Sequence, residues 1–196
     1  MANRNTVGFG LIPTGTVGAT PATAGQGKYF IDAAYDKDLF QGTVVQSKVG
    51  YIKAAEATRT LNTIGILNGI FYNAATTLKP TFDNKYIQPI TPANSEDITA
   101  FVIDNPLQLF VGNLNAAAAQ ADYGRTVSMT AAVPSGSTTS GQSDKKLDDA
   151  NIHDTNNQFR LLRSAEDPEN DENAANRSVV VCQNLNQYLT NAVTWQ

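Results

Sequence analysis

The sequence of 196 residues contains a single cysteine, Cys182, and a single histidine, His153. One cysteine excludes a disulfide framework within the chain and fits a reducing compartment such as the cytosol. One histidine leaves little material for a histidine-based metal centre or a Ser-His-Asp site, which need several residues held in a defined arrangement. We interpret His153 as a solvated loop residue and Cys182, in the apolar run VVVC, as a small buried hydrophobe.

Charged residues are also scarce, at 16% of the chain against a usual fraction of about 25%. There are 14 Lys and Arg residues and 18 Asp and Glu residues, and the positive charges form no cluster along the chain. Nucleic acid is therefore not an expected partner, because phosphate contacts require clustered cations. No apolar run reaches the roughly 18 residues of a membrane span, so we expect no membrane partner either. Uncharged polar residues carry the polarity instead, which is common in structural proteins that assemble.

Motifs that bind cofactors or carry catalysis are missing from the sequence. The glycines of residues 8–15 lack the Lys-Ser/Thr of a P-loop, and GxGxxG does not occur. The acidic stretch 166–173 offers oxygen ligands for Ca²⁺ but lacks the EF-hand spacing, so we prefer a plain acidic loop and keep calcium as the alternative. We therefore expect no cofactor, no resident metal and no enzymatic activity.

Short β-like segments, each ended by Gly, Pro, Asn or Asp, fill most of residues 29–190. This pattern predicts a mainly-β domain built as an antiparallel β-barrel or sandwich. Residues 97–114 predict two strands that flank a tight corner at Asp104-Asn105-Pro106. Residues 116–122, AAAAQAD, predict the one short helix, and residues 135–157 predict a polar loop region.

Two further segments predict strand pairs whose turns are less clearly placed. Residues 43–55 predict two short strands with a turn near Ser47 and Lys48. Residues 63–75 place Asn68-Gly69 between apolar runs. That arrangement fits a hairpin, but it also fits one continuous strand with a glycine bulge.

The N-terminal stretch VGFGLIPTGTVGATPATAGQG has neither a helical nor a strand period. It carries too little apolar surface to offset the entropy of its own ordering, so residues 1–28 are set apart from the β domain, as is a C-terminal tail at 191–196. A disordered tail is one interpretation of residues 1–28. The other is an extended arm that becomes ordered against a neighbouring subunit, with Phe9, Leu11 and Ile12 as the contact residues. We then expect that removing residues 1–27 leaves the β domain folded.

Four segments follow this start in a fixed order: TIGILNGIFYNAA, EDITAFVIDNPLQLFVGNL, GQSDKKL and SVVVCQNLNQYL. The combination resembles the capsid cement (decoration) proteins of tailed bacteriophages over most of residues 5–189. The resemblance implies a β-rich domain without catalytic activity that is made in the host cytoplasm and ends up on the capsid exterior of the virion. There it would bind the major capsid protein and itself, commonly as a homotrimer.

Two other function classes compete with a cement protein. A carbohydrate- or receptor-binding β module of a phage head fibre or tail would expose aromatic platforms, for which Tyr51, Tyr72, Tyr86 and Tyr123 are candidates, although packing in the core or on a sheet face is the preferred interpretation for most of them. A hydrolase would need a deep cleft with two acids about 5–10 Å apart.

Overall fold

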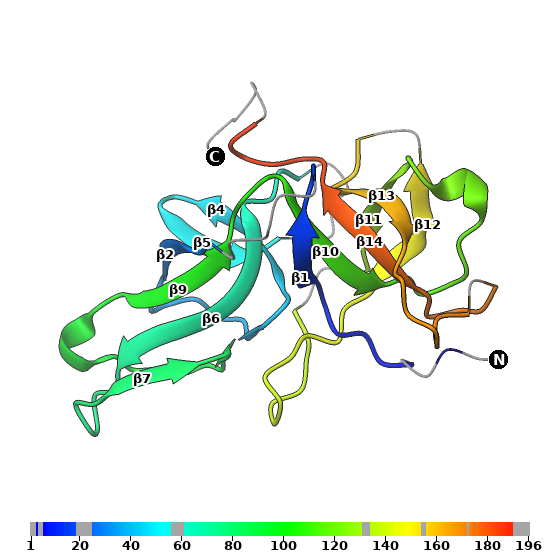
Figure 1. Cartoon of the computed structure of the whole chain (residues 1–196). Coiled ribbons are helices and arrows are strands. Elements are labelled where there is room, and N and C mark those ends of the chain that lie inside the picture. Colours follow the sequence, from blue (N-terminus) through cyan, green and yellow to red (C-terminus); the bar gives the residue numbers. More distant parts are fainter. Residues whose placement is uncertain are drawn as a thin grey trace.

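Two large antiparallel β-sheets make up the protein, and they form two lobes side by side (Figure 1). The computed structural model describes residues 3, 6–18, 25–55, 61–130, 134–153, 156–171 and 173–189. Within these residues the helical elements are two short 3₁₀ turns, η1 (Ala93–Ser95) and η2 (Gln120–Asp122). No helix in the described part of the chain is long and apolar enough to span a membrane. The prediction of a mainly-β, antiparallel fold is confirmed.

Sheet A contains six strands and curls on itself. Leu114 and Leu147 form an isolated bridge between its two sides, and the Asn115 N–H donates to the Leu147 carbonyl at 3.0 Å. The outermost strands β1 and β12 do not pair, so the barrel is not closed and the fold is compatible with a sandwich. Its strands, in spatial order, are β1 (Ile12–Thr16), β10 (Gln108–Asn113), β14 (Ser178–Gln183), β13 (Phe159–Ser164), β11 (Thr126–Met129) and β12 (Leu147–His153).

Sheet B is a second antiparallel sheet, and its strand β7 pairs with β6 to form a hairpin at the end of its lobe (Figure 1). A two-stranded ribbon of β3 (Leu39–Phe40) and β8 (Lys85–Tyr86) accompanies it. The strands of sheet B are β2 (Gly27–Ile31), β9 (Ile98–Ile103), β6 (Gly65–Asn73), β4 (Val44–Lys48), β5 (Tyr51–Ala54) and β7 (Pro80–Asp83).

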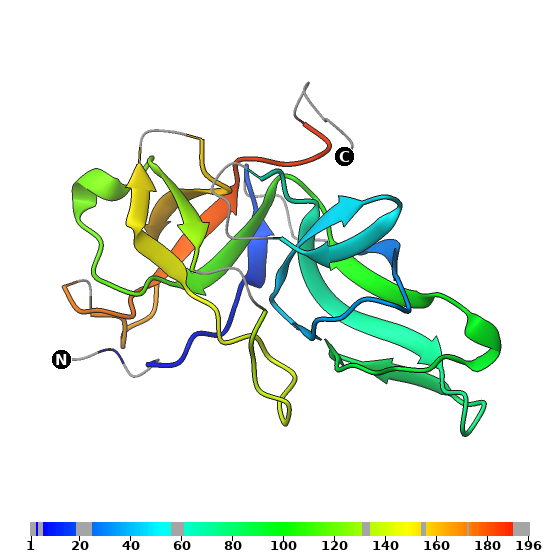
Figure 2. The ribbon, with the colours of Figure 1, turned by 180° about the vertical axis from the view of Figure 1, so that it is seen from behind.

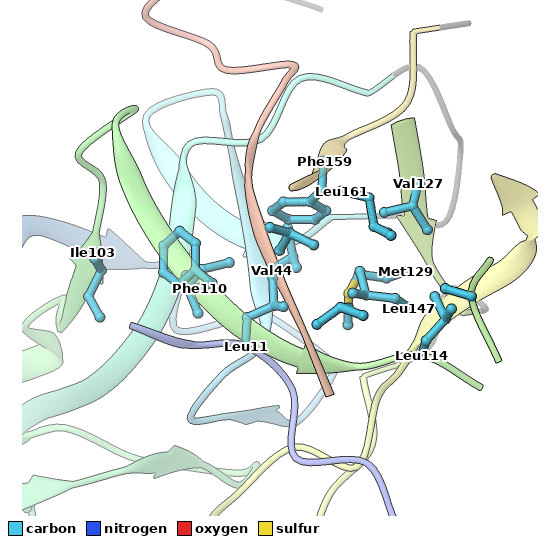
Figure 3. Close-up of a cluster of buried hydrophobic side chains, with 14 residues drawn as sticks. Leu11, Val44, Ile103, Phe110, Leu114, Val127, Met129, Leu147, Phe159 and Leu161 are labelled. Carbon is cyan, nitrogen blue, oxygen red and sulfur yellow. The ribbon is translucent and has the colours of Figure 1, made fainter. Parts of the chain in front are cut away.

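Each sheet has its own hydrophobic core, and three residues of sheet B connect the two lobes. Val44, Ile66 and Ile103 pack into the core of sheet A, where Figure 3 shows Val44 near Leu11 and Phe110. The core of sheet A contains Phe110 and Phe159. The core of sheet B, among the described residues, contains no phenylalanine and consists of aliphatic side chains and Tyr86.

The chain crosses from sheet B to sheet A at a corner between β9 and β10. The Leu107 N–H donates to Asn105 Oδ1 at 3.0 Å, and the Gln108 N–H donates to the Asn105 carbonyl at 3.0 Å. Residues 97–114 thus form two strands joined by a tight corner, as the sequence predicted, but the strands belong to different sheets.

The Asn68-Gly69 pair lies inside a strand. β6 continues through it, and its register with β9 shifts between Leu67 and Gly69, which marks a bulge. Of the two interpretations, the continuous strand is therefore correct and the hairpin is wrong. The turn between β4 and β5 falls at Val49-Gly50, two residues beyond the predicted position, and both of its residues have positive φ (54° and 83°), as a two-residue hairpin turn requires.

Two secondary-structure predictions are wrong. Residues 116–122 form no α-helix, because Ala118 is buried in the core of sheet A and its carbonyl accepts a bond of 2.7 Å from Arg177 Nη1. These tertiary contacts outweigh the alanine preference of a segment too short to nucleate a stable helix. The second wrong prediction is the polar loop over residues 135–157, because this region contains β12. β12 is an outer strand with mostly polar side chains, so its sequence lacks the apolar alternation that predicts a strand.

Candidate binding surfaces

The N-terminal segment is built into the fold of its own chain. β1 pairs with β10 from Ile12 opposite Val111 to Thr16 opposite Gln108. Both views of the ribbon show β1 between the two lobes (Figure 1 and Figure 2). Leu11 is 1% exposed and belongs to the core of sheet A. Its assignment as a contact to a neighbouring subunit is therefore wrong, because its side chain is already buried within the chain.

Polar contacts hold the segment before β1 in place. The Asp171 N–H donates to Asn3 Oδ1 at 2.6 Å, and Asn3 Nδ2 donates back to the Asp171 carbonyl at 3.1 Å. Lys146 Nζ donates to the Thr6 carbonyl at 2.6 Å. Backbone pairing and these bonds order a segment whose composition offers little hydrophobic burial. Because removing residues 1–27 would take away β1 and open the core at Leu11, we now expect this deletion to destabilise the domain.

The other two predicted contact residues are accessible to different degrees. Phe9 is half-buried and lines a hollow of about 440 Å³ together with Gly8 and the loop 136–144. Ile12 is 42% exposed. Two more exposed apolar side chains lie at the far end of β1, where the Val17 N–H donates to the Leu107 carbonyl at 2.9 Å. We call Ile12, Val17 and Leu107 the N-terminal surface.

A second apolar surface covers the outer side of sheet B. Residues directly opposite one another in antiparallel strands share a face. One row across four strands runs from Phe30 through Thr99 and Phe71 to Phe82. The adjacent row runs from Lys28 through Phe101 to Gly69. We call Phe30, Phe71, Phe82 and Phe101 the phenylalanine face.

The rings of the phenylalanine face contact one another. Phe71 and Phe82 have centroids 4.6 Å apart and planes tilted by 45°. Phe82 and Phe101 have centroids 6.4 Å apart and nearly parallel planes, at 16°. Phe82 is nevertheless 73% exposed. Large exposed apolar groups that lie together mark interaction sites more often than isolated ones do.

A hollow of about 280 Å³ opens beside this face above Gly69. Phe82 and Phe101 line it on the apolar side, and Asn68 and Asn84 line it on the polar side. Gly69 also lines the hollow, and a Cβ at this position would lie 2.9 Å from the Asp83 carbonyl oxygen of β7. A larger hollow of about 420 Å³ lies beside Tyr72, Asp83, Lys85 and Ile90.

The tyrosines that were candidate platforms do not gather on one surface. Tyr86 is buried and donates through Oη to the Tyr35 carbonyl at 2.9 Å. Tyr123 lies under the guanidinium of Arg177, 5.4 Å from its ring centroid. Tyr72 packs against the core of sheet B, and Tyr51 is half-buried on β5. The aromatic side chains that gather on one surface are phenylalanines, which the sequence analysis did not single out.

Tyr29 forms a polar cluster near the corner between the sheets. Its Oη donates to Asp104 Oδ2 at 2.7 Å and contacts Tyr188 Oη. Burial, followed by the hydrogen bonds to Tyr188 and Asp104, raises the pKa of Tyr29 well above its ordinary value. The cluster thus holds a neutral phenol beside a carboxylate and fastens residue 188 to β2.

The remaining chemically interesting residues are dispersed. His153 ends β12 half-buried, not in a solvated loop, and its carbonyl accepts a bond from Thr126 Oγ1 at 3.0 Å. Cys182 lies half-buried on β14, where burial raises the pKa of its thiol. Within the described ranges no three His, Cys, Asp or Glu side chains are grouped to hold a metal.

The hollows described here do not match the cleft expected of a hydrolase. Each of the three is lined by one acidic residue, Asp83 or Asp144. The comparisons with protein-family models, with curated proteins and with solved structures find no match for this chain.

Proposed function

We propose that this chain is a capsid cement protein of a tailed bacteriophage, which binds the major capsid protein on the outside of the icosahedral shell and stabilises the shell as a homotrimer. The proposal joins the sequence resemblance to one structural observation. Apolar side chains of the N-terminal surface stand exposed on a strand that is itself firmly held.

The N-terminal surface suits a partner that covers it. Ile12 is 42% exposed, Val17 46% and Leu107 56%. Because β1 is paired along one edge with β10, these side chains lie on ordered backbone. Little conformational entropy is then lost when a partner binds them. β1 is also the outermost strand of its sheet. Outer strands are commonly covered by another chain or otherwise protected from one.

The affinity of a cement protein comes from repetition. A small contact of three apolar side chains gives modest binding by itself. In an oligomer on a regular lattice, each later contact forms at a high effective concentration, so the total strength exceeds that of one contact. A homotrimer at a local three-fold position would repeat the N-terminal surface three times.

The test is binding to shells purified without this protein from the phage that encodes it. Wild-type protein should co-sediment with the shells in a fixed ratio to the capsid protein and raise the temperature at which they break. The triple variant Ile12→Ser/Val17→Ser/Leu107→Ser should bind at least about tenfold more weakly. Val49→Ser is the control, because Val49 is also apolar, is 76% exposed and lies away from this surface on the β4–β5 turn.

Circular dichroism of both variants verifies that they are folded before binding is compared. The proposal fails if the chain is missing from purified virions, or if wild-type protein does not sediment with shells. If the triple variant and the control bind equally, the shell is still the partner, but the N-terminal surface is not the part of the chain that contacts it.

A further inference from the structure

We propose that the hollow above Gly69, between Phe82 and Phe101, binds a neutral sugar residue of a glycan. This site goes beyond the proposed role on the shell, since it lies on sheet B and shares no residue with the N-terminal surface.

The placement of phenylalanine in sheet B is the first observation. Phenylalanine is normally among the residues that fill a core. Sheet B instead fills its core with aliphatic residues and Tyr86, and carries four phenylalanines on its outer face. The side chain of Lys28 lies over one of them, with Nζ 5.5 Å from the Phe30 centroid. The open part of the face is therefore the end with Phe82 and Phe101, beside the hollow.

The rings at this end are held in a defined orientation. Phe71 packs against Phe82 on one side, and Phe101 lies nearly parallel to Phe82 across the glycine. Aromatic rings are electron-rich on their faces. The C–H groups on one side of a pyranose carry the complementary partial charge, so a sugar ring can stack on the part of the Phe82 ring that is exposed.

The polar rim contains a network of side-chain amides. Gln41 bridges the two amides: its Nε2 donates to Asn68 Oδ1 at 2.9 Å, and its Oε1 accepts from Asn84 Nδ2 at 3.5 Å. Asn84 Nδ2 also donates to the Ser140 carbonyl at 2.7 Å. Asn84 Oδ1 lies against Gly141, where an added Cβ would clash with it, so this oxygen faces the loop 136–144. Within the described part of the chain, Asn68 Nδ2 forms no hydrogen bond. One donor group therefore remains at the rim, and a sugar hydroxyl oxygen can accept from it.

The volume of the hollow favours a small ligand. At about 280 Å³ it lies near the lower end of the range of small-molecule sites, which suits a single sugar residue. Pro80 at the start of β7 also disfavours pairing of this outer strand with another chain.

The experiment uses the full chain on a glycan array, followed by NMR titration with each oligosaccharide that the array identifies. We expect saturable shifts of the backbone amides of Asn68, Gly69 and Phe101. Phe82→Ala should weaken binding about three- to tenfold, because it removes the stacking face but leaves the rim. Leu78→Ala is the control: Leu78 is similarly exposed, lies on the β6–β7 loop outside the hollow, and its loss should leave binding unchanged.

Two results would overturn the sugar site. One is a glycan array on which no glycan binds the wild type more strongly than it binds Phe82→Ala. The other is concentration-dependent dimerisation of the wild type that Phe82→Ala abolishes, because the face would then contact a second copy. Shell co-sedimentation of Phe82→Ala is measured alongside and should equal wild type. Sugar binding and shell binding are thus measured separately. A failure of the sugar site leaves the shell proposal intact, and a failure of shell binding leaves the sugar site intact.

Discussion

The two sheets use phenylalanine in opposite ways. In sheet A, Phe110 and Phe159 are completely buried and form the centre of the core. In sheet B, Phe30 and Phe82 stand at the surface, and Phe71 and Phe101 are half-buried beside them. Both sheets are antiparallel and six-stranded, so the architecture alone does not explain the difference. Sheet A buries its phenylalanines in the core, and sheet B carries its phenylalanines on the outer face.

The largest effect should come from removing an aromatic ring of sheet A. Phe159→Ala should lower the free energy of unfolding by about 3–5 kcal/mol, because it leaves a cavity in a close-packed core. Phe82→Ala removes the same group from the surface of sheet B and should cost only about 0.5–1 kcal/mol. Urea unfolding followed by circular dichroism measures both. Similar losses in the two variants would mean that the rings of sheet B are structural.

The N-terminal segment gives a second contrast, between two adjacent residues. Leu11→Ala should cost about 2–5 kcal/mol, because Leu11 fills the core of sheet A beside Gly112. Ile12→Ala, next to it on the exposed side, should change stability by less than about 1 kcal/mol. The same unfolding experiment compares them. A stable Leu11→Ala protein would show that residues 1–18 are an appendage after all.

A smaller effect is expected from glycines of the same segment. A Cβ on Gly8 would lie 2.1 Å from the Asp144 carbonyl oxygen, so Gly8→Ala must displace backbone and should cost about 1–3 kcal/mol. A Cβ on Gly15 meets no atom within 4 Å, so Gly15→Ala should be neutral or stabilise by about 0.4–1 kcal/mol. Thermal unfolding should separate the two variants in opposite directions, and a lower Tm for Gly15→Ala would contradict this.

The smallest expected effect is a loss of stability at alkaline pH that comes from tyrosines of the sheet B lobe. Tyr29 and Tyr86, both in the sheet B lobe, have pKa values raised above the ordinary value, chiefly by burial. Above about pH 10 the unfolded chain releases these protons while the folded chain retains them, so the folded state binds more protons and stability falls as pH rises. Tyr29→Phe should flatten this alkaline fall in urea unfolding between about pH 8 and 11. An unchanged slope in both Tyr29→Phe and Tyr86→Phe would contradict the assignment.

The sequence was informative wherever a local pattern determines the structure. Alternating apolar runs and turn residues predicted the β class and most strands, and Asp104-Asn105-Pro106 predicted the corner. The sequence could not show that β9 and β10 enter different sheets, because both strands are apolar on both faces and periodicity then gives no partner. The same ambiguity concealed the phenylalanine face, since only the register reveals that four distant rings share one side.

The N-terminal segment shows another limit of sequence reasoning. Its composition predicted poor burial, which is true of the segment as a whole. The decisive facts are the pairing of β1 with β10 and the single anchor Leu11, and both depend on residues about a hundred positions away. Long-range backbone pairing leaves no local signature in Gly, Thr and Pro residues.

The corner between β9 and β10 has a mechanical consequence. β10 supports β1 and so the N-terminal surface, and β9 carries Phe101. A molecule held at the first surface and pulled at the second would transmit tension through β10, the corner and β9. Ladder hydrogen bonds run across the strand direction, so tension along the strands loads the bonds to β14 and β6 in parallel, as shear, and does not peel them apart one by one. We therefore expect the folded chain to resist a force applied between these two surfaces.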